Sequence, residues 1–174
     1  IKGQRMKEQS LFMKITEKLE SAVRWIVTIL LAIMVVDIIT AVFFRYVLQN
    51  SIFWAEELSR YLMIWAGMLG AGLAMKDDAH IGIDFVVRAL PDSMQLTVKV
   101  IAKLVVEIFL IVVFIESIDY LKTLSIQRSA ALEIPMAIPY LSVTAGMIFM
   151  AIENILGIIR LFDDAKSKGQ EASR

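Results

Sequence analysis

Residues 53–84 read FWAEELSRYLMIWAGMLGAGLAMKDDAHIGID, and this stretch decides the fold of the chain. Three ionisable residues, Glu56, Glu57 and Arg60, stand before a run of residues without a charge. A helix needs roughly 20 mostly apolar residues to cross the hydrocarbon core of a membrane. The stretch therefore predicts a membrane helix over about 54–75, with three charges at its beginning and many glycine and alanine residues along it.

The composition of the whole chain agrees with a membrane protein. Of its 174 residues 58% are hydrophobic, whereas soluble domains have roughly 45–50%. The chain has no cysteine, which excludes disulfides and cysteine-ligated zinc, and its one histidine, His80, excludes a haem held by two histidines of this chain. The formal net charge is zero, so nothing indicates a nucleic-acid partner. We expect no cofactor in this chain.

Four segments are long and apolar enough to predict an all-α integral membrane protein with four transmembrane helices. The third is the least apolar, because Lys99, Lys103 and Glu107 lie in its first third; lysines near a helix end can extend to the membrane surface. The predicted spans are about 25–46, 54–75, 96–119 and 140–162. They are flanked by an N-terminal arm, 1–24, and a polar tail, 163–174. Residues 1–5 precede Met6, a candidate native start, and no function is expected of them.

The distribution of Lys and Arg predicts the orientation of the spans. Fourteen of the 18 lie in the N-terminal arm, the middle connection with the start of the third span, or the C-terminal end, and four lie on the opposite side. Because positively charged loops stay in the cytoplasm, both termini are expected to be cytoplasmic.

The two longer connections have different patterns. In the segment of about 80–90, His80, Asp84 and Arg88 recur every four residues between apolar residues, which predicts a short amphipathic helix in the cytoplasmic membrane interface. Residues 132–140 read LEIPMAIPY, and two prolines so close together exclude a continuous helix. An ordered external loop is expected there.

On a helical wheel, the charges and the small residues of the second span share one face, and Trp65 lies opposite. Membrane helices associate through close approach at small residues and through polar contacts. We therefore expect this face to pack against another helix, either of this chain or of a partner. Its small residues are Gly67, Gly70, Ala71 and Ala74.

The charges inside the predicted spans need partners, since an unpaired charge in lipid costs several kcal/mol. Glu56 and Glu57 are spaced to pair with Arg60 along the helix. We expect the first two spans to pack together, with Asp37 near Arg60 and Arg45 near one of the glutamates. Structural ion pairs are favoured over a proton relay at Asp37 or a cation site at Glu56 and Glu57.

A second polar layer is predicted nearer the cytoplasmic side. Lys103 and Glu107 of the third span form a local pair, and Lys103 can also reach Glu153 of the fourth span. The sequence contains no nucleophile–base pair, metal cluster or phosphate-binding loop. No span is interrupted at its middle, as the substrate-binding helices of transporters often are. The chain is therefore expected to be a non-enzymatic small subunit that serves a larger partner.

The residues of the second span and its flanks also resemble a known family. The motif combines Arg45, then Trp54-x-Glu56-Glu57-x-x-Arg60-Tyr61, a glycine-rich run, and His80-x-x-x-Asp84. It is similar to the DctQ-type small membrane subunit of tripartite ATP-independent periplasmic (TRAP) transporters, and the resemblance covers nearly the whole chain after Met6. The chain looks like the separate type, not fused to the large subunit.

The resemblance implies a bacterial inner-membrane scaffold for a large, elevator-type permease subunit, its obligate partner. That partner would bind sodium and an organic acid, such as sialic acid or a four-carbon dicarboxylate, delivered by a periplasmic binding protein. Trp54, His80 and Asp84 would act as interfacial anchors. Charge alone suggests phospholipid headgroups near Lys76, Arg88 and Lys99.

Two other classes of protein fit part of the pattern. A small four-span multidrug exporter also has an acidic residue in its first span, but such chains are shorter and often lack a strong charge bias. A non-catalytic membrane anchor of an enzyme complex would need a partner to supply haem ligands.

Overall fold

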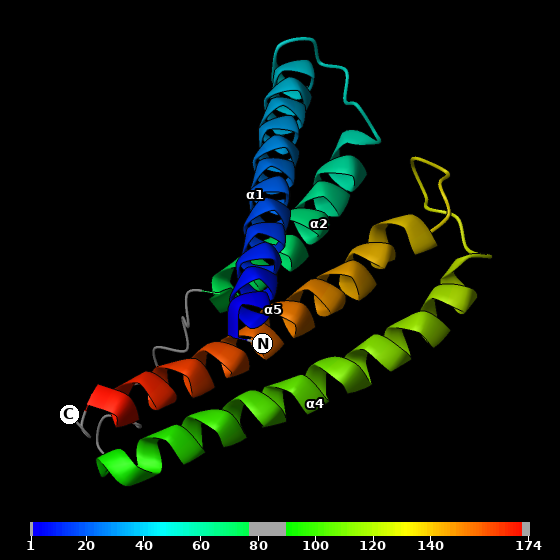
Figure 1. Cartoon of the computed structure of the whole chain (residues 1–174). Helices are drawn as coiled ribbons and strands as arrows, with labels where there is room; N and C mark the ends of the chain where they lie inside the picture. Colours follow the sequence, from blue (N-terminus) through cyan, green and yellow to red (C-terminus); the bar gives the residue numbers. More distant parts are fainter. Residues whose placement is uncertain (1, 77–89, 172–174) are drawn as a thin grey trace.

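The computed structural model describes residues 2–76 and 90–171, with side chains from Thr16 to Met75 and, apart from residues 92 and 93, from Leu90 to Phe162. Its regular structure in these ranges is helical, as predicted, and Figure 1 shows the four helices. They are α1 (Lys2–Tyr46), α2 (Ala55–Lys76), α4 (Asp92–Leu124) and α5 (Ala137–Glu171). The expected interfacial helix of about 80–90 lies outside the described residues.

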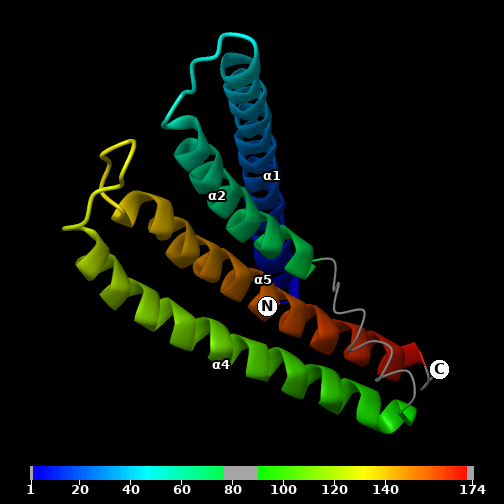
Figure 2. The same ribbon diagram turned by 180° about the vertical axis from the view of Figure 1, so that it is seen from behind.

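The four helices form an open row and do not close into a bundle. α1 packs against α2, α2 against α5, and α5 against α4, while no other pair of these described helices is in contact. Figures 1 and 2 show the resulting arrangement from opposite sides, with the α1–α2 pair inclined to the α4–α5 pair. The expected packing of the first two spans is therefore confirmed. Each end helix of the row has one neighbour within the described chain.

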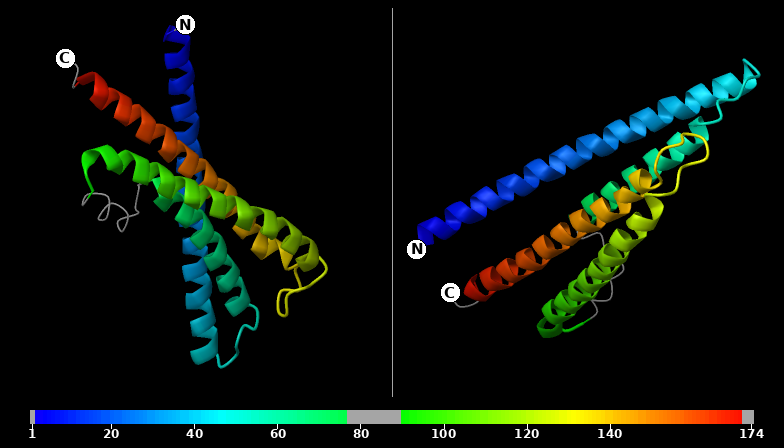
Figure 3. Two further views of the ribbon diagram at one scale, coloured as in Figure 1. Left: turned by 90° about the horizontal axis from the view of Figure 1, so that it is seen from below. Right: turned by 90° about the vertical axis from the view of Figure 1, so that its right-hand side faces the viewer.

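The two described connections lie at the same end of the molecule. In the right-hand view of Figure 3, residues 47–54 and 125–136 are found together at one end, and the N- and C-terminal ends of the described chain are at the other. We call the first the loop end and the second the termini end. Successive helices of the described chain therefore run in opposite directions between the two ends.

The helices run beyond the predicted spans. α1 continues without a break from the arm into the first span, and α5 continues past Phe162 to Glu171. α5 also begins at Ala137, ahead of the predicted start, with Pro139 in its first turn. Proline is tolerated in a first turn because the N–H that it lacks would have no partner within the helix.

Three of the described helical segments are long and apolar enough to cross a membrane. They are Thr16–Tyr46, Ala55–Met75 and Ala137–Phe162. α4, which contains the predicted third span, is not one of them. α4 covers the whole predicted span and has 33 residues, but charged residues recur along it, including Lys103, Glu107 and Glu116.

The contact of α2 with α5 joins the two halves of the row through two glycines. A Cβ at Gly72 of α2 would run into the Phe149 ring of α5, and a Cβ at Gly146 of α5 would lie 2.8 Å from Cβ of Met68 on α2. Each glycine thus makes room for a large side chain of the other helix. Leu69 and Phe149, 8% and 5% exposed, belong to the same buried cluster.

We expect Gly146→Ala to lower the free energy of unfolding by about 1–3 kcal/mol, because the added methyl group overpacks the contact between α2 and α5. The midpoint of thermal unfolding of the detergent-purified protein measures the effect. Gly67→Ala is the matched control, since a Cβ there meets no atom within 4 Å. Alanine is the better helix former, so the control should be neutral or more stable than the wild type. Equal effects of both substitutions would contradict the role of Gly146.

Candidate functional site

The small-residue face of α2, made of Gly67, Gly70, Ala71 and Ala74, is not covered by this chain. A Cβ at Gly67 or at Gly70 would meet no heavy atom within 4 Å. Ala71 and Ala74 are exposed, whereas Leu69 on the other side of the helix is buried. The sequence predicted that this face packs against a helix of this chain or of a partner. Packing against a helix of this chain is wrong for the described helices. The bulky side of α2 faces inward and the small side faces outward.

An exposed ion pair lies at the loop end of α2, about two to three turns before the small residues. Arg60 Nη2 contacts Glu56 Oε1 at 3.3 Å, which confirms the expected pairing along the helix. The two side chains are 59% and 81% exposed. An exposed pair of this kind contributes little to the stability of a single chain. Both charges are therefore available to another molecule.

Asp37 of α1 has a different partner from the one predicted. Its carboxylate, in a residue only 9% exposed, accepts a hydrogen bond of 2.5 Å from Ser59 Oγ of α2. The expected partner, Arg60, instead contacts Glu56. Consecutive residues point about 100° apart on a helix, so α2 can turn Ser59 or Arg60 toward α1 but not both. The contact with Asp37 joins α1 and α2 inside the membrane-spanning region.

Arg45 lies at the loop end of α1 and lines a cavity of about 390 Å³ together with Glu56. Arg45 was predicted to lie near one of the α2 glutamates, and it does line the same cavity as Glu56. No ion pair links the two side chains in the described structure. Asp37, Arg45 and the α2 glutamates are therefore not one continuous ionic network.

Glu57 ties the beginning of α2 to the connection between α4 and α5. Its Oε2 accepts hydrogen bonds from the backbone N–H groups of Ala131 and Leu132, at 2.7 and 3.2 Å. Its Oε1 accepts one from the hydroxyl of Tyr61. The expected pairing of Glu57 with Arg60 along the helix is not found. Carboxylates form strong hydrogen bonds with backbone N–H groups, and here the bonds are made to residues more than 70 positions away in the sequence.

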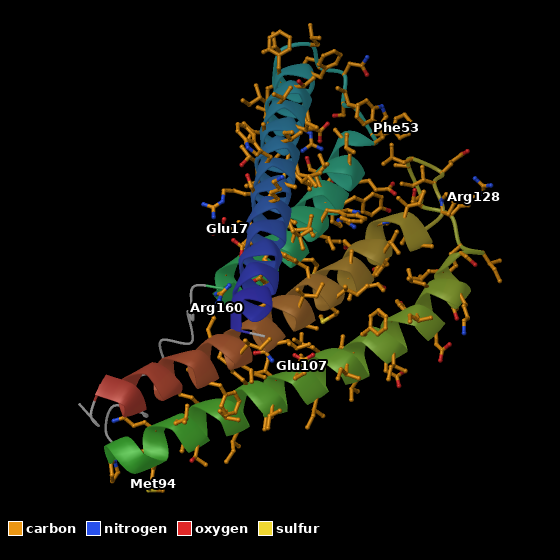
Figure 4. The ribbon with its side chains drawn as sticks, in the orientation of Figure 1. Glu17, Phe53, Met94, Glu107, Arg128 and Arg160 are labelled. Atoms are coloured by element: carbon orange, nitrogen blue, oxygen red, sulfur yellow. The ribbon has the colours of Figure 1, made fainter. Side chains whose placement is uncertain are left out.

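Residues 125–136 form an ordered loop, as predicted from the prolines, but the last four residues of the predicted stretch 132–140 belong to α5. Arg128 and Pro135 form an isolated antiparallel bridge, and Arg128 Nη1 donates a hydrogen bond of 2.9 Å to the Glu133 carbonyl. Glu133 takes a positive φ of 54°, which allows the tight reversal. Figure 4 shows Arg128 on this loop and Phe53 just before α2, on neighbouring parts of the loop end.

The second polar layer lies between α4 and α5, where it was predicted. Lys103, Glu153 and Asn154 are buried, at 7%, 1% and 1% exposure. Asn154 Nδ2 donates hydrogen bonds to the Lys103 carbonyl at 2.8 Å and to Glu107 Oε2 at 2.9 Å. Figure 4 shows Glu107 in the space between the two helices. The absence of a side chain at Gly157 makes room for the Lys103 ammonium group.

The remaining predicted residues are only partly described. Trp54 lies just before α2 and is 38% exposed, and Lys99 is half-buried near the start of α4. α2 ends at Lys76, whose side chain is outside the described part. His80, Asp84 and Arg88 also lie outside it. Among the described residues no group of three or more His, Asp or Glu side chains is placed to hold a metal ion.

Three residues that take part in these contacts were not predicted from the sequence: Ser59, Ala131 and Leu132. Ser59 stands within the charged motif, so the helical period could have placed it toward α1. The two loop residues act through their backbone N–H groups, which any residue except proline has.

The family model and the curated relatives that match this chain point to one kind of protein. Residues 34–164 match the family model of tripartite ATP-independent periplasmic transporters, DctQ component. A putative TRAP transporter small permease protein of Haemophilus influenzae is 25% identical over 162 residues, which cover 93% of this chain and 98% of the relative. The sialic acid TRAP transporter small permease protein SiaQ of Vibrio cholerae is 22% identical, covering 86% and 88% of the two chains. The C4-dicarboxylate TRAP transporter small permease protein DctQ of that organism is 25% identical, covering 65% and 49%.

We expect Glu57→Gln to release the loop of residues 125–136 from α2, because a neutral amide is a weaker acceptor for the two backbone N–H groups than a carboxylate. Hydrogen–deuterium exchange of the peptide containing Ala131 and Leu132 should become faster. Glu56→Gln is the control, since its carboxylate contacts only Arg60 in the described structure. Unchanged exchange in Glu57→Gln would show that the carboxylate does not hold the loop.

Proposed function

Because the chain belongs to the DctQ component family of tripartite ATP-independent periplasmic transporters, we propose that it braces a large permease subunit in the bacterial inner membrane. The large subunit would carry the sodium and substrate sites and move during transport. The small subunit would be its fixed support. The proposed partner is thus obligate for function, and this chain takes no part in binding the ions or the substrate.

The observation that carries the proposal is the uncovered small-residue face of α2. Gly67 and Gly70 leave space for another backbone to approach, and no described part of this chain occupies that space. In lipid, such close approach is a main source of helix association. The exposed Glu56–Arg60 pair adds two charges at the loop end of the face. A helix of the large subunit fits this combination of close packing and polar contact.

The outer face of α4 differs from the small-residue face of α2 in the size of its side chains. Its exposed residues are large, and they include Val105, Ile108, Phe109 and Val112, each more than half exposed. Bulky branched side chains keep another helix at a distance but are well solvated by lipid chains. The contrast supports α2 as the side for the protein partner and α4 as the side for lipid.

We further propose that all four helices cross the membrane and that both termini are cytoplasmic. α4 packs along α5, and the short loop 125–136 joins their ends. With 33 residues, α4 is about 50 Å long, which exceeds the roughly 30 Å of the hydrocarbon core. The excess of Lys and Arg in segments at the termini end supports a cytoplasmic location for that end. The loop end would then face the periplasm.

The proposed substrate is an organic acid. The relatives named for sialic acid and for C4-dicarboxylate transport make these two classes the first to test. A periplasmic binding protein would deliver the acid to the large subunit. The loop 125–136 is held by Glu57 and exposes residues 125–128 at the proposed periplasmic end, and it is the candidate contact of this chain with that protein.

We expect the double substitution Gly67→Leu and Ala71→Leu to remove the large permease subunit from tagged preparations of this chain. Recovery should fall by about tenfold or more, which corresponds to ~1.4 kcal/mol of association free energy. The experiment is a pull-down from gently solubilised native membranes, with bound proteins identified by mass spectrometry. The wild type should recover a large many-span permease in near one-to-one ratio.

The control for this pull-down is Val105→Leu, on the exposed face of α4, which should leave recovery unchanged. Recovery of this chain alone from wild-type membranes, as a dimer that binds hydrophobic cations, would refute the scaffold function. Full recovery with the double substitution would refute the assignment of the α2 face.

The orientation can be tested with single cysteines, because the chain has none of its own. In intact cells a membrane-impermeant thiol reagent that enters the periplasm should label Ala130→Cys, in the loop between α4 and α5. It should label Ser167→Cys only after the membrane is opened. Labelling in the reverse pattern would refute cytoplasmic termini.

A further inference from the structure

A groove between the loop-end halves of α4 and α5 lies apart from the α2 face. Its volume is about 400 Å³, within the range of small-ligand sites. The walls are mostly apolar, with Val113 and Leu121 from α4 and Val143 from α5. Glu116 contributes the one charged group of the lining.

The Glu116 carboxylate is exposed in this groove and has no ion-pair or hydrogen-bond partner within the described chain. The next carboxylate toward the loop end is different, because Asp119 contacts Lys122 Nζ at 2.5 Å. A carboxylate close to lipid needs a positive partner. For Glu116 that partner has to come from outside the described part of this chain.

The depth of Glu116 matches the edge of the hydrocarbon core. Ile108 is the middle residue of α4, and Glu116 lies eight residues beyond it, or ~12 Å along the helix. Half the thickness of the hydrocarbon core is ~15 Å. If α4 crosses the membrane as proposed above, the carboxylate is just inside the boundary with the headgroups.

Two tyrosines lie about one helical turn nearer the loop end than Glu116. Tyr120 of α4 and Tyr140 of α5 both line the groove, with ring centroids 5.9 Å apart in an edge-to-face arrangement. Aromatic rings at the membrane boundary attract cationic groups. Between the helices, Ser117 Oγ donates a hydrogen bond to the Phe114 carbonyl at 2.7 Å and accepts one from Thr144 Oγ1 at 2.9 Å, so the groove offers its carboxylate as the main polar contact.

We infer that this groove binds an aminophospholipid of the periplasmic leaflet, with its primary ammonium group on Glu116 and its first chain carbons along the apolar wall. Charge complementarity selects a cationic headgroup. An ammonium with three N–H donors can form charge-assisted hydrogen bonds with the carboxylate, whereas a quaternary ammonium has no donor. The large exposed residues around the groove on α4, such as Ile115 and Val112, favour a lipid over a helix as the occupant.

The test uses the full chain together with any large subunit that accompanies it, reconstituted in vesicles with equal parts of phosphatidylethanolamine, phosphatidylcholine and phosphatidylglycerol. After extraction, native mass spectrometry identifies the lipids that remain bound. The wild type should retain phosphatidylethanolamine over phosphatidylcholine, and Glu116→Gln should reduce that preference by about tenfold, the loss expected for one charge-assisted contact. Asp119→Asn is the matched control and should keep the preference. Equal retention of the lipids by the wild type, or the same loss in both variants, would overturn the inference.

A second measurement identifies the group that contacts Glu116 directly. A membrane-permeant carbodiimide activates the carboxyl group, and a primary amine in contact then forms an amide with net loss of water. An adduct of phosphatidylethanolamine on the Glu116 peptide is the expected product. A cross-link to a lysine of the large subunit, or the absence of any amine adduct, would refute the lipid site. Recovery of the large subunit should be the same for Glu116→Gln and wild type, so a failed lipid site leaves the scaffold proposal separately testable.

Discussion

The close contact between α2 and α5 is the constraint on which the rest of the described structure depends. It is the one helix contact that joins the α1–α2 pair to the α4–α5 pair. Gly72 and Gly146 let each helix receive a large side chain of the other, Phe149 and Met68. This reciprocal packing turns the bulky side of α2 inward. The small-residue face of α2 then has to point away from the chain, which makes it available to a partner.

An open row of helices buries little surface, so polar contacts take a larger part in holding it together. Two of the three neighbouring pairs have a polar contact between their helices: Asp37 with Ser59 for α1 and α2, and Asn154 with Glu107 for α4 and α5. Glu57 adds a bond from α2 to the loop that precedes α5. In lipid, where apolar burial between helices contributes little, such contacts fix the arrangement of the row.

The sequence predicted the helices well because their signals are local. Apolar runs, the prolines near the connection between α4 and α5, and the Glu56–Arg60 pair each involve residues close in the chain. It predicted that α2 has a small-residue face but not which way that face points, since this depends on α5. The partner of Asp37 was wrong by one residue, Ser59 in place of Arg60, because a shift of one position turns a helix by about 100°. The bond from Glu57 to Ala131 joins distant residues through backbone groups, which no side-chain pattern reveals.

The spatial order of the row differs from the order in which the chain is synthesised. α4 precedes α5 in the sequence, yet α5 is its one neighbour among the described helices. While α4 is emerging from the ribosome, Lys103 and Glu107 have none of the shelter that Asn154 and Gly157 later provide. Entry of α4 into the bilayer by itself would expose these charges to hydrocarbon. If α4 crosses the membrane as proposed above, insertion of α4 and α5 together, as a helical hairpin closed by the loop 125–136, would avoid that intermediate.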